Sequence, residues 1–122
     1  MTPTPFPIAA VLPPNLAGQD WFVGDIHGHF GRLEQALDNA GFRRDRDRLI
    51  CVGDLVDRGP SSGDSLAWLE YPWFLSVRGN HDDLFLTWRS LRQDPEKQLQ
   101  FGEQTWFRNG GRWILRTPEA QQ

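Results

Sequence analysis

The fold of this chain is decided by three Gly-flanked segments: Gly-Asp-Ile-His-Gly at residues 24–28, Gly-Asp-Leu-Val-Asp-Arg-Gly at 53–59 and Arg-Gly-Asn-His-Asp at 78–82. Each follows a short apolar run, and each precedes a stretch with helix-like character. This alternation predicts an α/β fold with the order β-α-β-α-β-α. Because right-handed crossovers bring the carboxyl ends of parallel strands to one sheet edge, the three segments should meet there.

Apolar runs and breakers place the individual elements. Strands are expected at 21–23, 49–52 and 73–77. A first helix fits 30–40, where Gly41 supplies a left-handed stop. A short helix begins at Pro60, with Ser62 as its cap. A third helix carries the apolar residues of 84–91 and ends at Asp94-Pro95, and the remainder is expected to be less regular.

Length and composition set the outer limits. The 122 residues suffice for one domain, which we place at 19–122 behind a proline-rich arm at 1–18. The net charge of −3 gives no basic footprint for nucleic acid, and no apolar run suits a signal or a membrane span. Cys51 is the single cysteine and is expected to be a small buried hydrophobe. These features favour a cytoplasmic protein.

The residue types in the three segments are those of metal ligands. Asp25 and His27 lie two positions apart, so on an extended exit from the strand they would reach one divalent ion. Asp54 has two oxygens and could bridge that ion to a second one. Asn80 offers a neutral amide oxygen. A pair of divalent ions is a known device of phosphoryl chemistry, so this pattern predicts a two-metal site.

Neighbouring residues supply the other groups that such chemistry needs. His81 could protonate a leaving alkoxide, with Asp57 orienting its imidazole. Arg58 and Arg78 offer planar forks suited to phosphate oxygens. His29 is more simply a packing or solvated residue. Taken singly, each aspartate is more often a turn residue than a ligand, but three coincident turns are hard to explain that way.

The same three blocks resemble those of the calcineurin-like metallophosphoesterases, above all the phosphoprotein phosphatases of the small bacterial and bacteriophage-lambda type. Tyr-Pro-Trp-Phe at 71–74 and Trp-Phe-Arg-Asn-Gly-Gly at 106–111 are also similar to that subgroup. The resemblance implies a β-sandwich flanked by helices, of which this chain supplies about the first half. It also implies two metal ions, usually manganese with iron or zinc as alternatives.

The resemblance assigns roles to matching positions. Asp25, His27 and Asp54 would hold the first metal, and Asp54 with Asn80 the second. His81 and Asp57 would form an acid pair, while Arg58 and Arg78 would bind phosphate. Family members supply further metal-binding histidines beyond this stretch, whereas the histidines here all lie in the three blocks. We therefore expect either a fragment or a natural truncation, with an incomplete second metal site.

Three functions follow as hypotheses. The first is a serine/threonine, or dual-specificity, protein phosphatase that uses a metal-activated hydroxide and is weak or inactive as this chain alone. The second is a symmetrical diadenosine-tetraphosphate hydrolase. Asp57 makes this alternative less favoured, because those enzymes tend to carry a small residue at the matching position. The third is a non-catalytic module, either a truncated and inactive remnant or a unit that self-associates through an uncovered sheet face.

Overall fold

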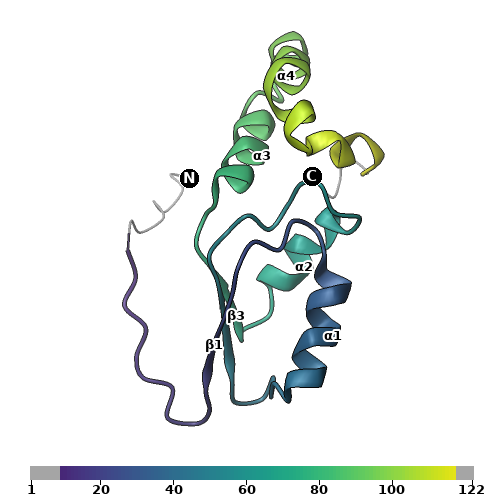
Figure 1. Cartoon of the computed structure of the whole chain (residues 1–122). Helices are drawn as coiled ribbons and strands as arrows, with labels where there is room; N and C mark the ends of the chain where they lie inside the picture. Colours follow the sequence, from purple (N-terminus) through teal and green to yellow (C-terminus); the bar gives the residue numbers. More distant parts are fainter. Residues whose placement is uncertain (1–8, 118–122) are drawn as a thin grey trace.

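A three-stranded parallel sheet forms the centre of the protein (Figure 1). The computed structural model describes residues 9–117. Strands β1 (Asp20–Val23), β2 (Arg48–Cys51) and β3 (Phe74–Ser76) lie side by side in that order, and both pairs are parallel. The three strands and their direction are as predicted, although β3 is shorter at both ends. The chain therefore has the expected α/β architecture.

Helices α1 (Phe30–Ala40) and α2 (Ser65–Leu69) cover one face of this sheet (Figure 1). Helix α1 has the predicted bounds, and Gly41 ends it in the left-handed conformation with φ 81°. The core between helices and sheet is aromatic: the Trp68 ring lies 5.1 Å from that of Phe30 and 5.5 Å from those of Trp73 and Phe74. This packing fixes the strand ends from which the three segments emerge.

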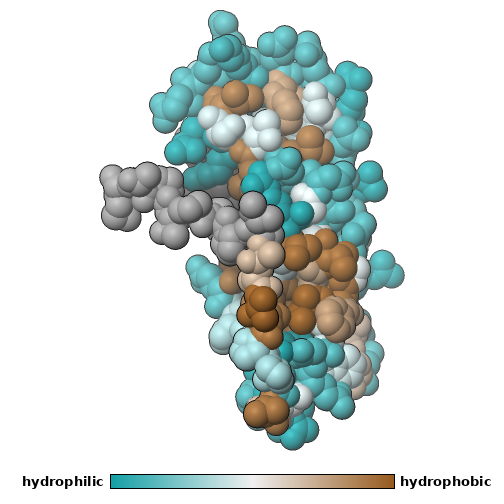
Figure 2. Space-filling model, turned by 90° about the vertical axis from the view of Figure 1, so that its left-hand side faces the viewer, coloured by the Kyte–Doolittle hydropathy of each residue, from teal (hydrophilic) through white to brown (hydrophobic). Residues whose placement is uncertain are grey.

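The opposite face of the sheet is apolar and open (Figure 2). Side chains alternate along a strand, so Phe22, Ile50 and Leu75, which share one register row, face away from the helices. Phe22 is 74% exposed, and Val52 and Val77 at the strand ends are 54% and 61% exposed. The expected uncovered face is therefore present on the described part of the chain.

The segment that leads into β1 has neither helix nor strand over residues 9–19. Asp47 ties its end to the domain, because its carboxylate accepts hydrogen bonds from the backbone N–H groups of Gln19 (2.9 Å) and Arg43 (2.8 Å). These two bonds hold the pKa of Asp47 below its usual value. The first eight residues of the predicted arm lie outside the described residues, and the domain boundary at 18/19 remains a prediction.

The structure corrects two helix assignments. Ser62 does not cap α2; it begins a 3₁₀ turn (Ser62–Asp64), and its hydroxyl accepts a hydrogen bond from the Asp57 backbone N–H at 3.0 Å. Helix α3 (Asn80–Ser90) ends before Asp94-Pro95, and these residues start a further helix, α4 (Pro95–Phe101). Asp94 is its N-cap and accepts from the Lys97 N–H, with Pro95 in the first turn.

The C-terminal part is also more regular than expected. A π-helical turn η2 (Gly102–Trp106) is followed by the 3₁₀ turns η3 (Phe107–Asn109) and η4 (Gly111–Arg116). With α3 they enclose a second apolar core of Trp88, Trp106, Phe107 and Ile114. Most of the six tryptophans are thus buried in the two cores, which agrees with the packing role predicted for them.

Helix length bears on the membrane question. Among residues 9–117 no helix combines the length and the apolar character that a membrane crossing requires.

Candidate metal centre

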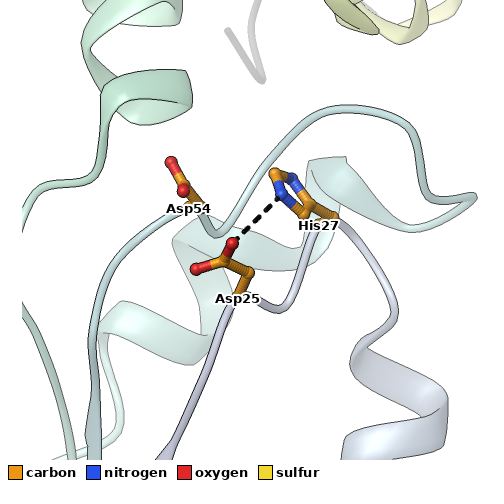
Figure 3. A group of neighbouring side chains, drawn as sticks. All are labelled: Asp25, His27 and Asp54. Carbon is orange, nitrogen blue, oxygen red and sulfur yellow. Dashed lines mark ion pairs between the residues drawn. The ribbon is translucent and has the colours of Figure 1, made fainter.

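Asp25, His27 and Asp54 come together at the carboxyl ends of β1 and β2 (Figure 3). One ligand atom from each lies within 4.8 Å of the others. The His27 Nε2 atom is 3.7 Å from an Asp25 carboxylate oxygen, and the Asp54 side chain lies to the left of these two residues in Figure 3. The sheet edge therefore gathers the three predicted ligands of the first metal, although Asp25 and Asp54 are far apart in sequence.

Backbone hydrogen bonds lock the first two segments together. The Asp54 carbonyl accepts from the N–H groups of Ile26 (3.1 Å) and His27 (2.9 Å), and the Leu55 carbonyl accepts from Gly28 (2.8 Å). The turn at 25–28 is thus fastened to the turn at 53–55 rather than free to move. Such a fixed frame is what a preformed ligand set requires.

Unusual backbone geometry is concentrated at these turns. Within the described residues, the non-glycine residues with positive φ are His27 (44°), Asp54 (56°), Asp57 (80°) and Arg58 (73°). All four belong to the predicted site. Strained conformations of this kind persist only where the surroundings impose them, and they cluster at functional sites. Asp25 and His27 approach each other as predicted, but the chain turns at His27, whose own backbone is left-handed, so the exit from β1 is not extended throughout.

The imidazole of His27 is oriented for metal binding. Its Nδ1 atom lies 3.0 Å from the Val56 carbonyl oxygen, and a carbonyl can only accept. Nδ1 therefore carries a proton, which leaves Nε2, the ring nitrogen nearest Asp25, as the atom that could bind a metal ion. A histidine held this way through its second nitrogen is the usual arrangement of a metal ligand.

Asn80 faces Asp54 from the start of α3. The amide atom nearest the carboxylate is 3.1 and 3.2 Å from the two Asp54 oxygens. If that atom is nitrogen, Asn80 donates to the carboxylate. If it is oxygen, three oxygens converge, and they would need a cation between them. The donor set of carboxylates, imidazole and amide therefore fits divalent ions, with Asp54 between the two predicted positions.

Asp82 holds the third segment against the second. Its carboxylate accepts from the backbone N–H groups of Asp54 (2.9 Å), Leu55 (2.8 Å) and Gly79 (2.9 Å). It thus caps α3 and closes the turn that carries Asp54 at the same time. Sequence analysis did not identify this residue as part of the site. The acidic residue at the third position of α3 was a signal for a cap, but not for the bonds across the sheet edge.

We expect Asp82→Ala to lower the free energy of unfolding by about 2–3 kcal/mol, because three buried or half-buried N–H groups lose a charged acceptor. Urea denaturation followed by circular dichroism measures this loss. Asp83→Ala is the control, since Asp83 is exposed and its ion pair with Arg78 lies at the surface. It should change the free energy of unfolding by less than about 1 kcal/mol. Equal losses in the two variants would contradict the role given to Asp82.

The predicted acid pair lies beside the metal cluster. The His81 Nδ1 atom is 2.9 Å from an Asp57 carboxylate oxygen, and both side chains are buried. The His81 ring packs edge-on against that of His27, with 4.7 Å between ring centroids. The backbone N–H of His81 also donates to the Asp54 carboxylate at 2.9 Å. The pairing of His81 with Asp57 is therefore present in the geometry, while its catalytic role remains a prediction.

The two arginines differ in how they are held. Arg78 is exposed and forms an ion pair with Asp83. Arg58 is exposed too, and its backbone N–H donates to the Gly110 carbonyl at 3.0 Å. Phosphate binding by either one stays a prediction. His29 does not join the metal cluster; its Nδ1 lies 3.3 Å from the Ile26 carbonyl, as suits a local packing role.

Cys51 is the last residue of the central strand β2 and is fully buried. Burial raises the pKa of its thiol, so the thiolate that a nucleophile needs is disfavoured. The sulfur lies near the carbonyl oxygens of Gly24 (3.6 Å) and Gly53 (3.4 Å). The prediction of a small buried hydrophobe is confirmed.

Comparison with known proteins agrees with this geometry. Residues 21–117 match the family model described as calcineurin-like phosphoesterase. The chain is 42% identical over 96 residues to serine/threonine-protein phosphatase 1 of Salmonella typhimurium, across 79% of this chain and 40% of that protein. It is 48% identical over 67 residues to a symmetrical bis(5'-nucleosyl)-tetraphosphatase of a Shewanella species, across 51% of this chain and 23% of that protein.

A solved structure is similar as well. The crystal structure of a protein named as a diadenosine tetraphosphatase superposes with a TM-score of 0.57 at 34% identity, over 75% of this chain and 45% of that one. The chain thus spans less than half the length of these relatives. The matched family, the parallel sheet and the ligand cluster agree with one another. The chain belongs to the calcineurin-like phosphoesterase family.

Proposed function

We propose that the site serves metal-dependent hydrolysis of phosphomonoesters, on serine/threonine or dual-specificity phosphoprotein substrates. The observation that carries the proposal is the contact between two groups of residues: the Asp25–His27–Asp54 cluster and the buried His81–Asp57 pair, joined by the rings of His27 and His81. A ligand set for divalent ions beside a histidine–carboxylate pair is suited to activating water and protonating a leaving oxygen.

Asp25, His27 and Asp54 would hold the first ion, and Asp54 with Asn80 the second, with manganese as the ion we expect. When bound, such ions supply a nucleophile at neutral pH and neutralise phosphate charge. The chain's own residues do the rest. Asp57 orients His81 so that Nε2 is the nitrogen left to give a proton to the leaving oxygen. Arg58 and Arg78 would hold phosphate oxygens, for which Arg78 must exchange its Asp83 partner.

The alternative substrate is diadenosine tetraphosphate. It is supported by the similarity to the Shewanella tetraphosphatase and by the superposed structure named for the same activity. The first substrate class is supported by the similarity to the Salmonella phosphatase, which extends over a larger share of this chain. Asp57 also favours it, since a small residue is expected there in the tetraphosphatases. A cytoplasmic setting suits the single buried thiol and belongs to the same proposal.

Turnover by residues 1–122 in the presence of Mn²⁺ tests this choice. We expect weak or undetectable hydrolysis of p-nitrophenyl phosphate, and phosphoserine peptides cleaved faster than diadenosine tetraphosphate wherever turnover is measurable. Hydrolysis of diadenosine tetraphosphate with phosphopeptides left untouched would overturn the substrate assignment. Robust turnover by a demonstrated monomer would contradict the expectation of weak activity.

Self-association through the open sheet face is the proposed interaction of this chain. Phe22, Val52 and Val77 expose apolar surface there, and burying it against a second copy would be favourable. We expect light scattering to show a species larger than a monomer and Phe22→Lys to shift it toward the monomer. Leu99→Lys, at a 53% exposed position of α4, is the control. A wild-type monomer with a cooperative thermal transition would contradict the proposal.

A further inference from the structure

The segment of residues 102–116 packs against the acid pair, although the proposed reaction gives it no role. It contains the Trp-Phe-Arg-Asn-Gly-Gly stretch at 106–111, and its helical turns lie above the strand ends (Figure 1). Trp106 is fully buried, and Trp113 is partly buried against it with 6.1 Å between ring centroids. A segment that served only as a lid on a core would not need polar contacts to the site.

Both indole N–H groups are directed at one carboxylate. The Trp106 Nε1 donates to Asp57 Oδ2 at 2.8 Å, and the Trp113 Nε1 donates to Asp57 Oδ1 at 2.7 Å. His81 Nδ1 lies 2.9 Å from Asp57 Oδ2, the oxygen that Trp106 also contacts. Asp57 itself is fully buried. Three N–H groups thus fix both oxygens of a buried carboxylate, which is what such a group needs to remain in place.

The same segment also holds the backbone beneath that carboxylate. Asp57 and Arg58 are two consecutive residues with positive φ, a conformation that needs outside support. The Gly110 carbonyl accepts from the Arg58 N–H at 3.0 Å, and a Cβ on Gly110 would lie 2.6 Å from the Arg58 Cγ. Gly110 itself has φ 103°. The backbone at Gly110 therefore packs directly against the Asp57–Arg58 turn, and a residue with a side chain would not fit there.

We propose that Trp106 and Trp113 are positioning residues for the His81–Asp57 pair, acting through hydrogen bonds from their indole N–H groups to the two oxygens of Asp57. The description of His81 and Asp57 as an acid pair rests on the proposed function. The positioning of the Asp57 oxygens by the two indoles does not rest on that function, because it concerns only where these oxygens lie and how they hold His81. The alternative is that the two indoles only fill the second core.

Nitrogen-15 NMR of the 122-residue chain without metal separates these two roles. In the wild type, we expect two downfield, slowly exchanging indole N–H signals and a His81 ring with its proton on Nδ1. Asp57→Asn should shift both indole signals together. Trp106→Phe and Trp113→Phe should each change the His81 ring nitrogen shifts and speed exchange of its Nδ1 proton by about tenfold or more, the loss expected for one hydrogen bond to a charged group.

Trp88→Phe is the matched control. Trp88 is buried in the same core, 5.4 Å from the Trp106 ring, and among the described contacts its indole makes no bond to Asp57. It should lower stability and leave the His81 signals unchanged. If Trp106→Phe does not fold, the more exposed Trp113→Phe, or benzothienylalanine at 106, removes the N–H with less change of volume. Unchanged His81 signals in every folded variant would overturn the proposal, and missing phosphatase turnover would not.

Discussion

Asp54→Ala should abolish Mn²⁺ binding by this chain in isothermal titration. Asp54 belongs to the cluster with Asp25 and His27 and also faces Asn80, so it would be a ligand of both proposed ions. Its loss would therefore remove a ligand from both ions. Loss of an outer-shell partner typically lowers metal affinity by about 10–100-fold, so removal of a shared direct ligand should exceed that range.

The control for this variant is Asp45→Ala. Asp45 is an exposed aspartate whose charge is offset by Arg43 and which lies in the loop before β2, so the substitution makes the same change of net charge away from the site. Its Mn²⁺ affinity should stay within experimental error of the wild type. If Asp54→Ala and Asp45→Ala bind Mn²⁺ alike while both remain folded, the metal centre assigned to these residues is wrong.

Gly59→Ala should be among the most destabilising single substitutions in this chain. A Cβ at this position would overlap the His27 carbonyl oxygen and would lie 2.7 Å from the Gly28 carbonyl carbon. The backbone of His27 and Gly28 cannot move away from the added Cβ, because the 25–28 turn is hydrogen-bonded to Asp54 and Leu55. We expect a loss of about 3 kcal/mol or more in the free energy of unfolding, at or above the upper range of overpacking effects.

The same substitution should weaken metal binding, because it displaces the turn that presents His27. Gly31→Ala is the matched control: Gly31 lies in α1, and no atom from outside the adjoining helix backbone comes within 4 Å of its added Cβ. It should leave Mn²⁺ affinity unchanged and raise the free energy of unfolding by up to about 1 kcal/mol, since alanine favours helix over glycine. Thermal or urea unfolding of both variants, at equal protein concentration, gives the comparison. A stable Gly59→Ala protein with wild-type Mn²⁺ affinity would contradict the packing described for this turn.

Local sequence patterns were enough to predict the sheet edge. Periodicity and Gly41 gave the correct bounds of α1, and the apolar runs gave three parallel strands. The convergence of Asp25, His27 and Asp54 followed from topology alone, because parallel strands with crossovers end at one edge. The chemistry of the side chains suggested the pairing of His81 with Asp57 and the family resemblance repeated it, and the geometry contains that contact.

Contacts between distant segments account for what sequence analysis missed. The Ser62 hydroxyl is engaged by the backbone of Asp57, so the cap inferred from its position was wrong. Asp94-Pro95 can end one helix or begin another; here Asp94 caps α4, and Phe101 at the end of that helix packs against the second core. The bonds from Asp82, Trp106 and Trp113 to the site join residues separated by 27 to 56 positions, which no local pattern indicates.

Anomalous diffraction from crystals soaked in Mn²⁺ tests the central claim most directly. The claim is that the turns at the carboxyl ends of β1 and β2 form a metal centre from Asp25, His27 and Asp54. The account predicts the strongest manganese peak in contact with the His27 Nε2 atom and with carboxylate oxygens of Asp25 and Asp54. A strongest peak elsewhere on the molecule, or none at this cluster at saturating Mn²⁺, would contradict it.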